Sequence, residues 1–195
     1  MRSPAVKFVY SYPYDRTMSG LIGKEWSFKN EGMVRKQIKL IESAWAKLEG
    51  NVLKEMPRAT GLKWKVKEIR CYVNSYGVPF SDPLTITILT KTGSKKTMDR
   101  IIDNLVHELI HVFLSTSGFK SSQLKKFKKE SPLTRTHIFV HALHKHILLK
   151  FFGEERLRKT VDFSNKIKSE KPEYARVWEI VESKGFENII KEIKV

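Results

Sequence analysis

The sequence predicts an α+β fold with a short sheet in its first half and helices in its second half. The chain has 195 residues, of which 41% are hydrophobic, and this is enough for a core of its own. Short β-prone runs lie within the first 90 residues, around one long amphipathic helix. From residue 97 onward, apolar residues recur at helical spacing instead.

Each element of the first half follows from its own pattern. Residues 6–10 form a short β-prone run, and the turn-rich sequence SYPYDRTMSG after them is expected to be a loop. A helix is expected from Asn30 to Gly50, because one apolar stripe repeats there at spacings of three and four. This helix should lie on the sheet. Strands are expected at 64–73 and 84–90, and in the second strand Leu and Ile alternate with Thr, as in a strand with one buried face.

The second half is expected to be helical. Thr97 is a typical N-cap for a helix over 98–115, and another helix should run over 133–152, just after Pro132. Residues 154–195 should add two or three short helices.

We expect one domain over 1–195. Within it, the sheet and the helix at 98–115 lie in residues 1–118, and a helical subdomain occupies residues 119–195.

Composition narrows the class of protein. There are 37 Lys and Arg residues against 21 Asp and Glu residues, a formal net charge of +16. The single cysteine, Cys71, excludes a disulfide framework and a zinc site built from cysteines. No apolar run is long enough to span a bilayer, and the first residues lack the apolar core of a signal peptide. These features predict a soluble, cytoplasmic protein with no membrane partner.

The motif that carries chemistry is HExxH, at residues 107–111. On a helix, His107 and His111 lie on one face, so both imidazoles can reach a single metal ion. Glu108 is rotated away from that ligand position and suits the role of general base toward a water molecule on the metal. Imidazole nitrogens suit Zn²⁺, and a hydrolytic zinc site needs a third protein ligand.

Candidates for the third ligand lie in one later segment, THIFVHALHKHIL. His137, His141 and His144 are spaced by four and three residues, so they share one helical face, whereas His146 points elsewhere. Either His137 or His141 could bind the metal, and the other could contact a metal ligand and orient it without binding the metal itself.

At these residues the sequence resembles the zincin metallopeptidases, and in particular the small single-domain gluzincin-like proteins of archaea and bacteria, the minigluzincin-like group. The resemblance implies a sheet backed by a helix, an edge strand beside the active site at 84–90, and a later helix that supplies the third ligand. That ligand is a Glu, followed four residues later by an Asp, in the family pattern. Here the corresponding residues are His137 and His141, so His137 replaces the usual Glu.

The resemblance implies zinc-dependent hydrolysis of peptide bonds, with a peptide or protein as substrate and an endopeptidase as the enzyme. Glu108 would take the proton from the attacking water and pass it to the leaving amine. A donor for the oxyanion is also needed, and His144, Arg135 and Tyr174 are candidates by residue type. Residues 85–89 could pair with an extended substrate.

Two alternatives remain. One is a basic protein that associates with nucleic acid, as SprT-like zincins do, through the lysines of the segment Lys120–Lys129. The SprT-like pattern includes a Cys-rich zinc ribbon, which this chain lacks. The other alternative is a zincin that binds zinc but is latent or inactive.

Overall fold

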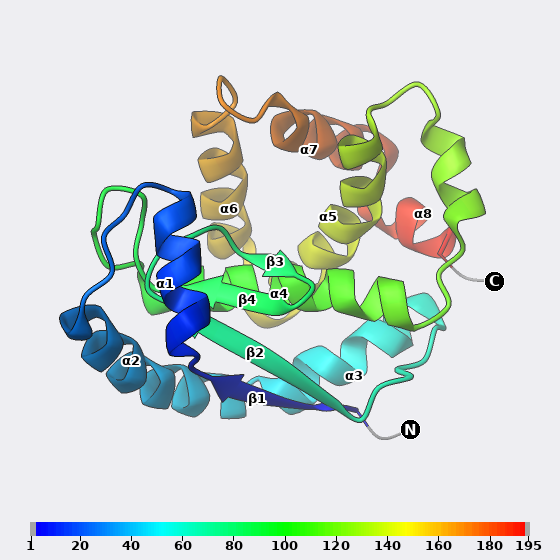
Figure 1. The fold of residues 1–195 in the computed structure, drawn as a ribbon. Helices are drawn as coiled ribbons and strands as arrows, with labels where there is room; N and C mark the ends of the chain where they lie inside the picture. The colour runs from blue at the N-terminus through cyan, green and yellow to red at the C-terminus, as the bar shows by residue number, and fades with distance from the viewer. Residues whose placement is uncertain (1–2, 194–195) are drawn as a thin grey trace. The chain divides into compact units, whose positions relative to one another are not determined.

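The computed structural model describes residues 3–193 (Figure 1). The fold is α+β, with a mixed four-stranded sheet and a mainly helical remainder, as the sequence predicts. Two compact units are present, one made of residues 3–51 and 66–112 and the other of residues 52–65 and 113–193. We call them the sheet unit and the helical unit. Within the described range, every helix is too short or too polar to cross a membrane.

The sheet belongs entirely to the sheet unit. Its strands have the order β1-β2-β4-β3, where β3 is antiparallel to β4 and the other pairs are parallel. Their bounds are β1 Ala5–Val9, β2 Glu68–Asn74, β3 Phe80–Ser81 and β4 Leu84–Thr87.

The expectation that residues 84–90 form an edge strand is wrong. Phe80 of β3 pairs with Thr85 of β4, and Lys95 bridges Leu89 farther along. The chain itself therefore covers much of the backbone that was expected to receive a substrate.

A helix, α1, occupies Tyr12–Leu21, where a loop was expected. Pro13 lies in its first turn, which accepts proline because the amide it lacks would have no intrahelical partner. The helix is fixed on the sheet unit by a distant contact: the Oδ1 atom of Asp15 accepts from the backbone N–H of Ser75 at 2.6 Å and from its hydroxyl at 2.8 Å.

The helix that backs the sheet is α2, Phe28–Ala46, which packs on β1 and β2 as expected. The hydroxyl oxygen of Ser27 caps it by accepting from the backbone N–H of Asn30. The expected end at Gly50 is wrong, because a separate helix, α3, begins at Glu49 and runs to Thr60.

The second half is helical, as predicted. Helix α4, Met98–Thr116, is followed by η1 Ser121–Phe127, α5 Pro132–Phe151, α6 Glu154–Lys166, α7 Pro172–Lys184 and α8 Phe186–Lys191. Helix α5 is the centre of the helical unit and packs against η1, α6, α7 and α8. Ser131 caps it by accepting from the backbone N–H of Thr134, and Pro132 follows as the first helical residue.

Candidate metal centre

Helix α4 carries the HExxH motif, and its sequence explains its placement. The side chain of Thr97 accepts from the backbone N–H of Arg100, so the predicted N-cap is confirmed. One apolar stripe of α4 recurs at helical spacing, and each of its members is at most 3% exposed: Ile102, Val106, Leu109 and Phe113. Because this stripe is buried, the rotation of α4 about its own axis is fixed, and His107 and His111 lie on a different face of the helix.

The two motif histidines lie on one face of α4, as predicted. The ring centroids of His107 and His111 are 5.0 Å apart, and both side chains are half-buried. Four residues along a helix make slightly more than one turn, so this stacking needs no distortion of the backbone. The pair offers two imidazoles to a single ion.

Glu108 is 9% exposed and lies close enough to β2 for its charge to act on a residue of that strand. Its negative charge acts on Cys71 of β2: burial first, and then the charge of Glu108, raise the pKa of the Cys71 thiol. Cys71 is fully buried and therefore stays protonated at neutral pH, which makes it a core residue rather than a metal ligand.

His137 lies near the start of α5 and is 7% exposed. Its Nδ1 atom is 2.9 Å from the carbonyl oxygen of Leu133, one turn earlier in the same helix. A hydrogen bond donated by Nδ1–H leaves the lone pair of the imidazole on Nε2, which is the arrangement common in metal-binding histidines. Burial lowers the pKa of His137, so the ring favours the neutral form that binds a metal.

His141 has an aromatic surrounding that the sequence analysis missed. Its ring centroid is 4.6 Å from that of Trp178 and 5.8 Å from that of Tyr174, both on α7. Tyr174 also touches His137, at 5.0 Å. The spacing of four between Tyr174 and Trp178 was the available signal, because it places both rings on one face of α7. These contacts fix the orientation of the two histidines on α5.

The remaining histidines of α5 have different environments. His144 is 2% exposed, and burial lowers its pKa to about 3, so it is neutral at physiological pH. His146 points to a different side of the helix, as predicted. Its Nε2 atom is 2.8 Å from Glu55 of α3, whose carboxylate also pairs with Lys150 at 2.7 Å. His146 is thus a structural residue of the helical unit.

His107 and His111 of the sheet unit and His137 of the helical unit are described residues that could each give one ring nitrogen to a metal ion. Three imidazoles suit a zinc ion, which prefers nitrogen and sulfur ligands. The assignment of His137 rather than His141 as a third ligand remains a prediction, as do the roles of Glu108, His144 and Tyr174.

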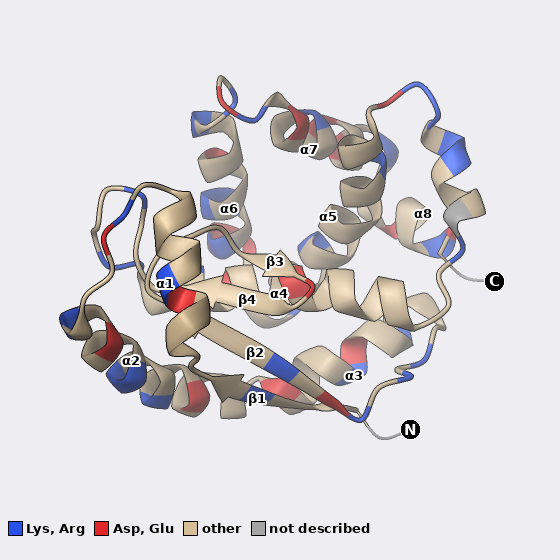
Figure 2. Cartoon of the chain, viewed as in Figure 1, with Lys and Arg blue, Asp and Glu red and all other residues tan. Residues whose placement is uncertain are grey.

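The segment Lys120–Lys129 is basic and mainly exposed, but its aromatic residue is buried and so cannot stack on a nucleic-acid base. Phe127 is 7% exposed and packs edge-on against Phe139 of α5 at 5.6 Å. Lys126 pairs with Glu192 at 3.5 Å. Basic residues are spread over the elements of both units, rather than gathered in this segment alone (Figure 2).

Comparison with models of known protein families, with curated proteins and with solved structures gave no match. The interpretation of this site therefore depends on the chemistry and geometry of its own residues.

Proposed function

We propose that this protein is a zinc-dependent metallopeptidase of the zincin type. The observation that carries the proposal is the placement of His107 and His111 on one face of α4, with rings 5.0 Å apart and with the carboxylate of Glu108 next to them in the sequence and nearly buried. One rigid helix thus supplies two of the three protein ligands that a hydrolytic zinc site needs, together with an adjacent general base.

His137 is the third ligand in this proposal. Its Nδ1–H is committed to the carbonyl oxygen of Leu133, which directs Nε2 outward from the turn as a ligand atom. His141 acts behind it, held by Trp178 and Tyr174. A set of three neutral imidazoles leaves a site with net positive charge when zinc is bound, and this favours the ionised form of a bound water.

Glu108 is the general base. Bound zinc would supply a water of lowered pKa and would polarise the carbonyl group of the substrate. Glu108 then takes the proton of the attacking water and delivers it to the amine that leaves. Its position away from the face of the two histidines keeps the carboxylate from occupying a ligand position.

The substitution Glu108→Ala tests the mechanism. The variant should bind zinc with the stoichiometry of the wild-type protein, measured by metal analysis after gel filtration, and should no longer cleave a quenched fluorogenic peptide library. Glu42→Ala is the matched control, because Glu42 is an exposed residue of α2. Wild-type rates in Glu108→Ala would refute the mechanism. A wild-type protein that binds zinc without cleaving any peptide would contradict the proposed activity and favour a latent protein.

The third ligand is tested by comparing His137→Ala with His141→Ala in zinc competition titrations. Loss of a residue that orients a ligand from behind typically weakens metal binding by about 10- to 100-fold. We therefore expect an effect of that size for His141→Ala and a larger one for His137→Ala. The reverse order would assign the ligand to His141.

A further inference from the structure

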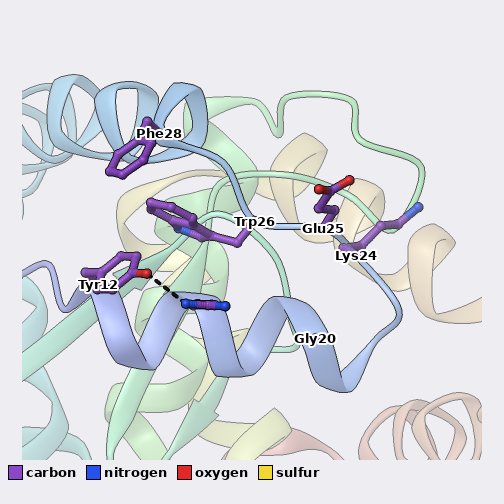
Figure 3. A pocket seen from close by; sticks show the side chains of 7 residues that line it. Tyr12, Gly20, Lys24, Glu25, Trp26 and Phe28 are labelled. Atoms are coloured by element: carbon purple, nitrogen blue, oxygen red, sulfur yellow. Dashed lines mark hydrogen bonds between the residues drawn. The ribbon is translucent and has the colours of Figure 1, made fainter.

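An aromatic pocket lies in the sheet unit, between α1 and the residues 24–28 that lead into α2 (Figure 3). It has a volume of about 400 Å³, within the range of about 300–1,000 Å³ that is usual for small-ligand pockets. Tyr12, Trp26 and Phe28 form one wall. Arg16, Lys24 and Glu25 supply its charged groups.

The central ring of the aromatic wall, Trp26, is held in place before any ligand binds. Figure 3 shows the indole of Trp26 between the rings of Tyr12 and Phe28, with centroid distances of 4.6 Å and 5.1 Å. The indole N–H is directed at the buried carboxylate of Asp15, at 3.2 Å. Because the ring is held in this way, little conformational entropy would be lost when a ligand stacks on the wall.

The wall is also exposed to an unusual degree. Phe28 is 80% exposed, although it is the first residue of α2, and Tyr12 is 38% exposed. Leu21, at the end of α1, is 74% exposed. Single exposed apolar residues are common on protein surfaces, but a cluster of this kind beside a pocket indicates a binding site.

The charged groups select the class of ligand. Arg16 donates to the hydroxyl of Tyr12 at 3.0 Å, which holds its guanidinium beside the aromatic wall. Lys24 adds a second cation, against the single carboxylate of Glu25. A rim with an excess of positive charge favours a ligand that combines a planar ring with an anionic group. An apolar protein segment offers no partner for the two cations.

We propose that this pocket binds single-stranded nucleic acid, with one unpaired base stacked on the exposed ring of Phe28, which Trp26 contacts edge-on, and with the adjoining phosphate near Arg16. Aromatic platforms beside cations are the usual means by which proteins bind single strands without reading their sequence. A duplex keeps its bases stacked on one another and cannot use this wall. The net charge of +16 would add long-range attraction.

The experiment uses the full chain and a fluorescein-labelled oligodeoxythymidine, with affinity measured by fluorescence anisotropy. Phe28→Ala should weaken binding by about 5- to 150-fold, the range expected when one stacked aromatic residue is replaced by alanine. Leu133→Ala is the matched control, because Leu133 is an exposed apolar residue of α5, and it should bind as the wild-type protein does. Arg16→Gln should reduce the slope of log affinity against log salt by about 0.7, the value for one phosphate contact in a single strand.

Two results would overturn the proposal: equal affinity for a duplex of the same length, and unchanged affinity in Phe28→Ala. If Phe28→Ala is unchanged and Lys125→Gln/Lys126→Gln loses all binding, the binding belongs to the segment Lys120–Lys129. Phe28 lies outside the proposed metal centre, so peptide cleavage by Phe28→Ala should match that of the wild-type protein, and the two proposals can fail separately.

Discussion

Lys96, in the segment that leads from β4 to α4, should make the stability of this protein depend on pH in the alkaline range. Its Nζ atom donates to the hydroxyl oxygen of Thr87, a fully buried residue, at 2.5 Å. Within residues 3–193, no carboxylate pairs with Lys96. Burial, and then the positive charge of Arg100, lower the pKa of Lys96 from 10.5 to about 8.

The size of the effect follows from that pKa. One pKa unit corresponds to about 1.4 kcal/mol, so the charged form of Lys96 costs the folded state about 3 kcal/mol below pH 8. Lys96→Met removes that cost but also takes a hydrogen-bond partner from the fully buried hydroxyl of Thr87, which costs about 1–3 kcal/mol. The variant should therefore gain stability relative to the wild-type protein at pH 7, by up to about 2 kcal/mol.

The sign of the pH dependence is also fixed. Between pH 8 and 10.5 the unfolded chain binds the lysine proton while the folded chain has lost it, so the free energy of unfolding of the wild-type protein gains a rising contribution with pH. Lys96→Met lacks this contribution. Urea denaturation at pH 7 and pH 10 measures the difference in free energy of unfolding between the two proteins. The contributions of the other titrating groups cancel in that difference.

Lys95→Met is the control, because Lys95 is the exposed neighbour in the same loop. Its pH profile should match that of the wild-type protein. The measured quantity is the free energy of unfolding of Lys96→Met minus that of the wild-type protein. If this quantity is the same at pH 7 and at pH 10, the ammonium group of Lys96 is solvated in the folded state and the reasoning is refuted.

Two further predictions concern residues that stabilise the two units. Glu55→Gln should destabilise the helical unit by about 1–3 kcal/mol at pH 7, because the buried carboxylate no longer accepts from the partly exposed His146 and Lys150. Denaturation at lower pH should show the difference shrinking, since those partners hold the pKa of Glu55 below its usual value of 4.5. An unchanged unfolding midpoint in Glu55→Gln would contradict the role assigned to this cluster. Ser27→Ala should cost about 1 kcal/mol in thermal or urea unfolding through the lost cap on Asn30, whereas Ser27→Asp, which keeps an acceptor, should cost less.

Helix α4 could be predicted almost completely because its determinants are local. An N-cap at Thr97, an apolar stripe on one face and the HExxH residues on another all lie within one continuous segment. The relation between His107 and His111 follows from helix geometry alone, so their shared face was predictable before any tertiary contact was known.

Helix α1 could not be predicted in this way because a distant residue stabilises it. Pro13, Ser19 and Gly20 give its sequence the composition of a turn, and local propensity therefore favours a loop. The contact of Asp15 with Ser75 joins residues 60 positions apart and supplies the missing stabilisation. Tertiary packing overrides weak propensity here, as it commonly does.

The histidines of α5 show where sequence reasoning about a site stops. Spacing places His137, His141 and His144 on one face, but the role of each depends on its partner. His137 bonds to Leu133 of its own helix, a local contact that the cap at Ser131 sets up. His141 meets an indole from α7, and no spacing within α5 encodes that contact.

The same distinction explains why helix geometry alone predicts the shared face of His107 and His111 but does not choose between His137 and His141 as a third ligand. His107 and His111 need only a helix to face one ion together. A third ligand needs a helix from elsewhere in the chain at a particular register, and changing that register by one turn exchanges His137 for His141. The hydrogen bond from His137 to Leu133 distinguishes the two candidates, because it fixes the tautomer of His137 with the lone pair on Nε2. A single local contact thus favours His137 where the spacing of the two residues could not.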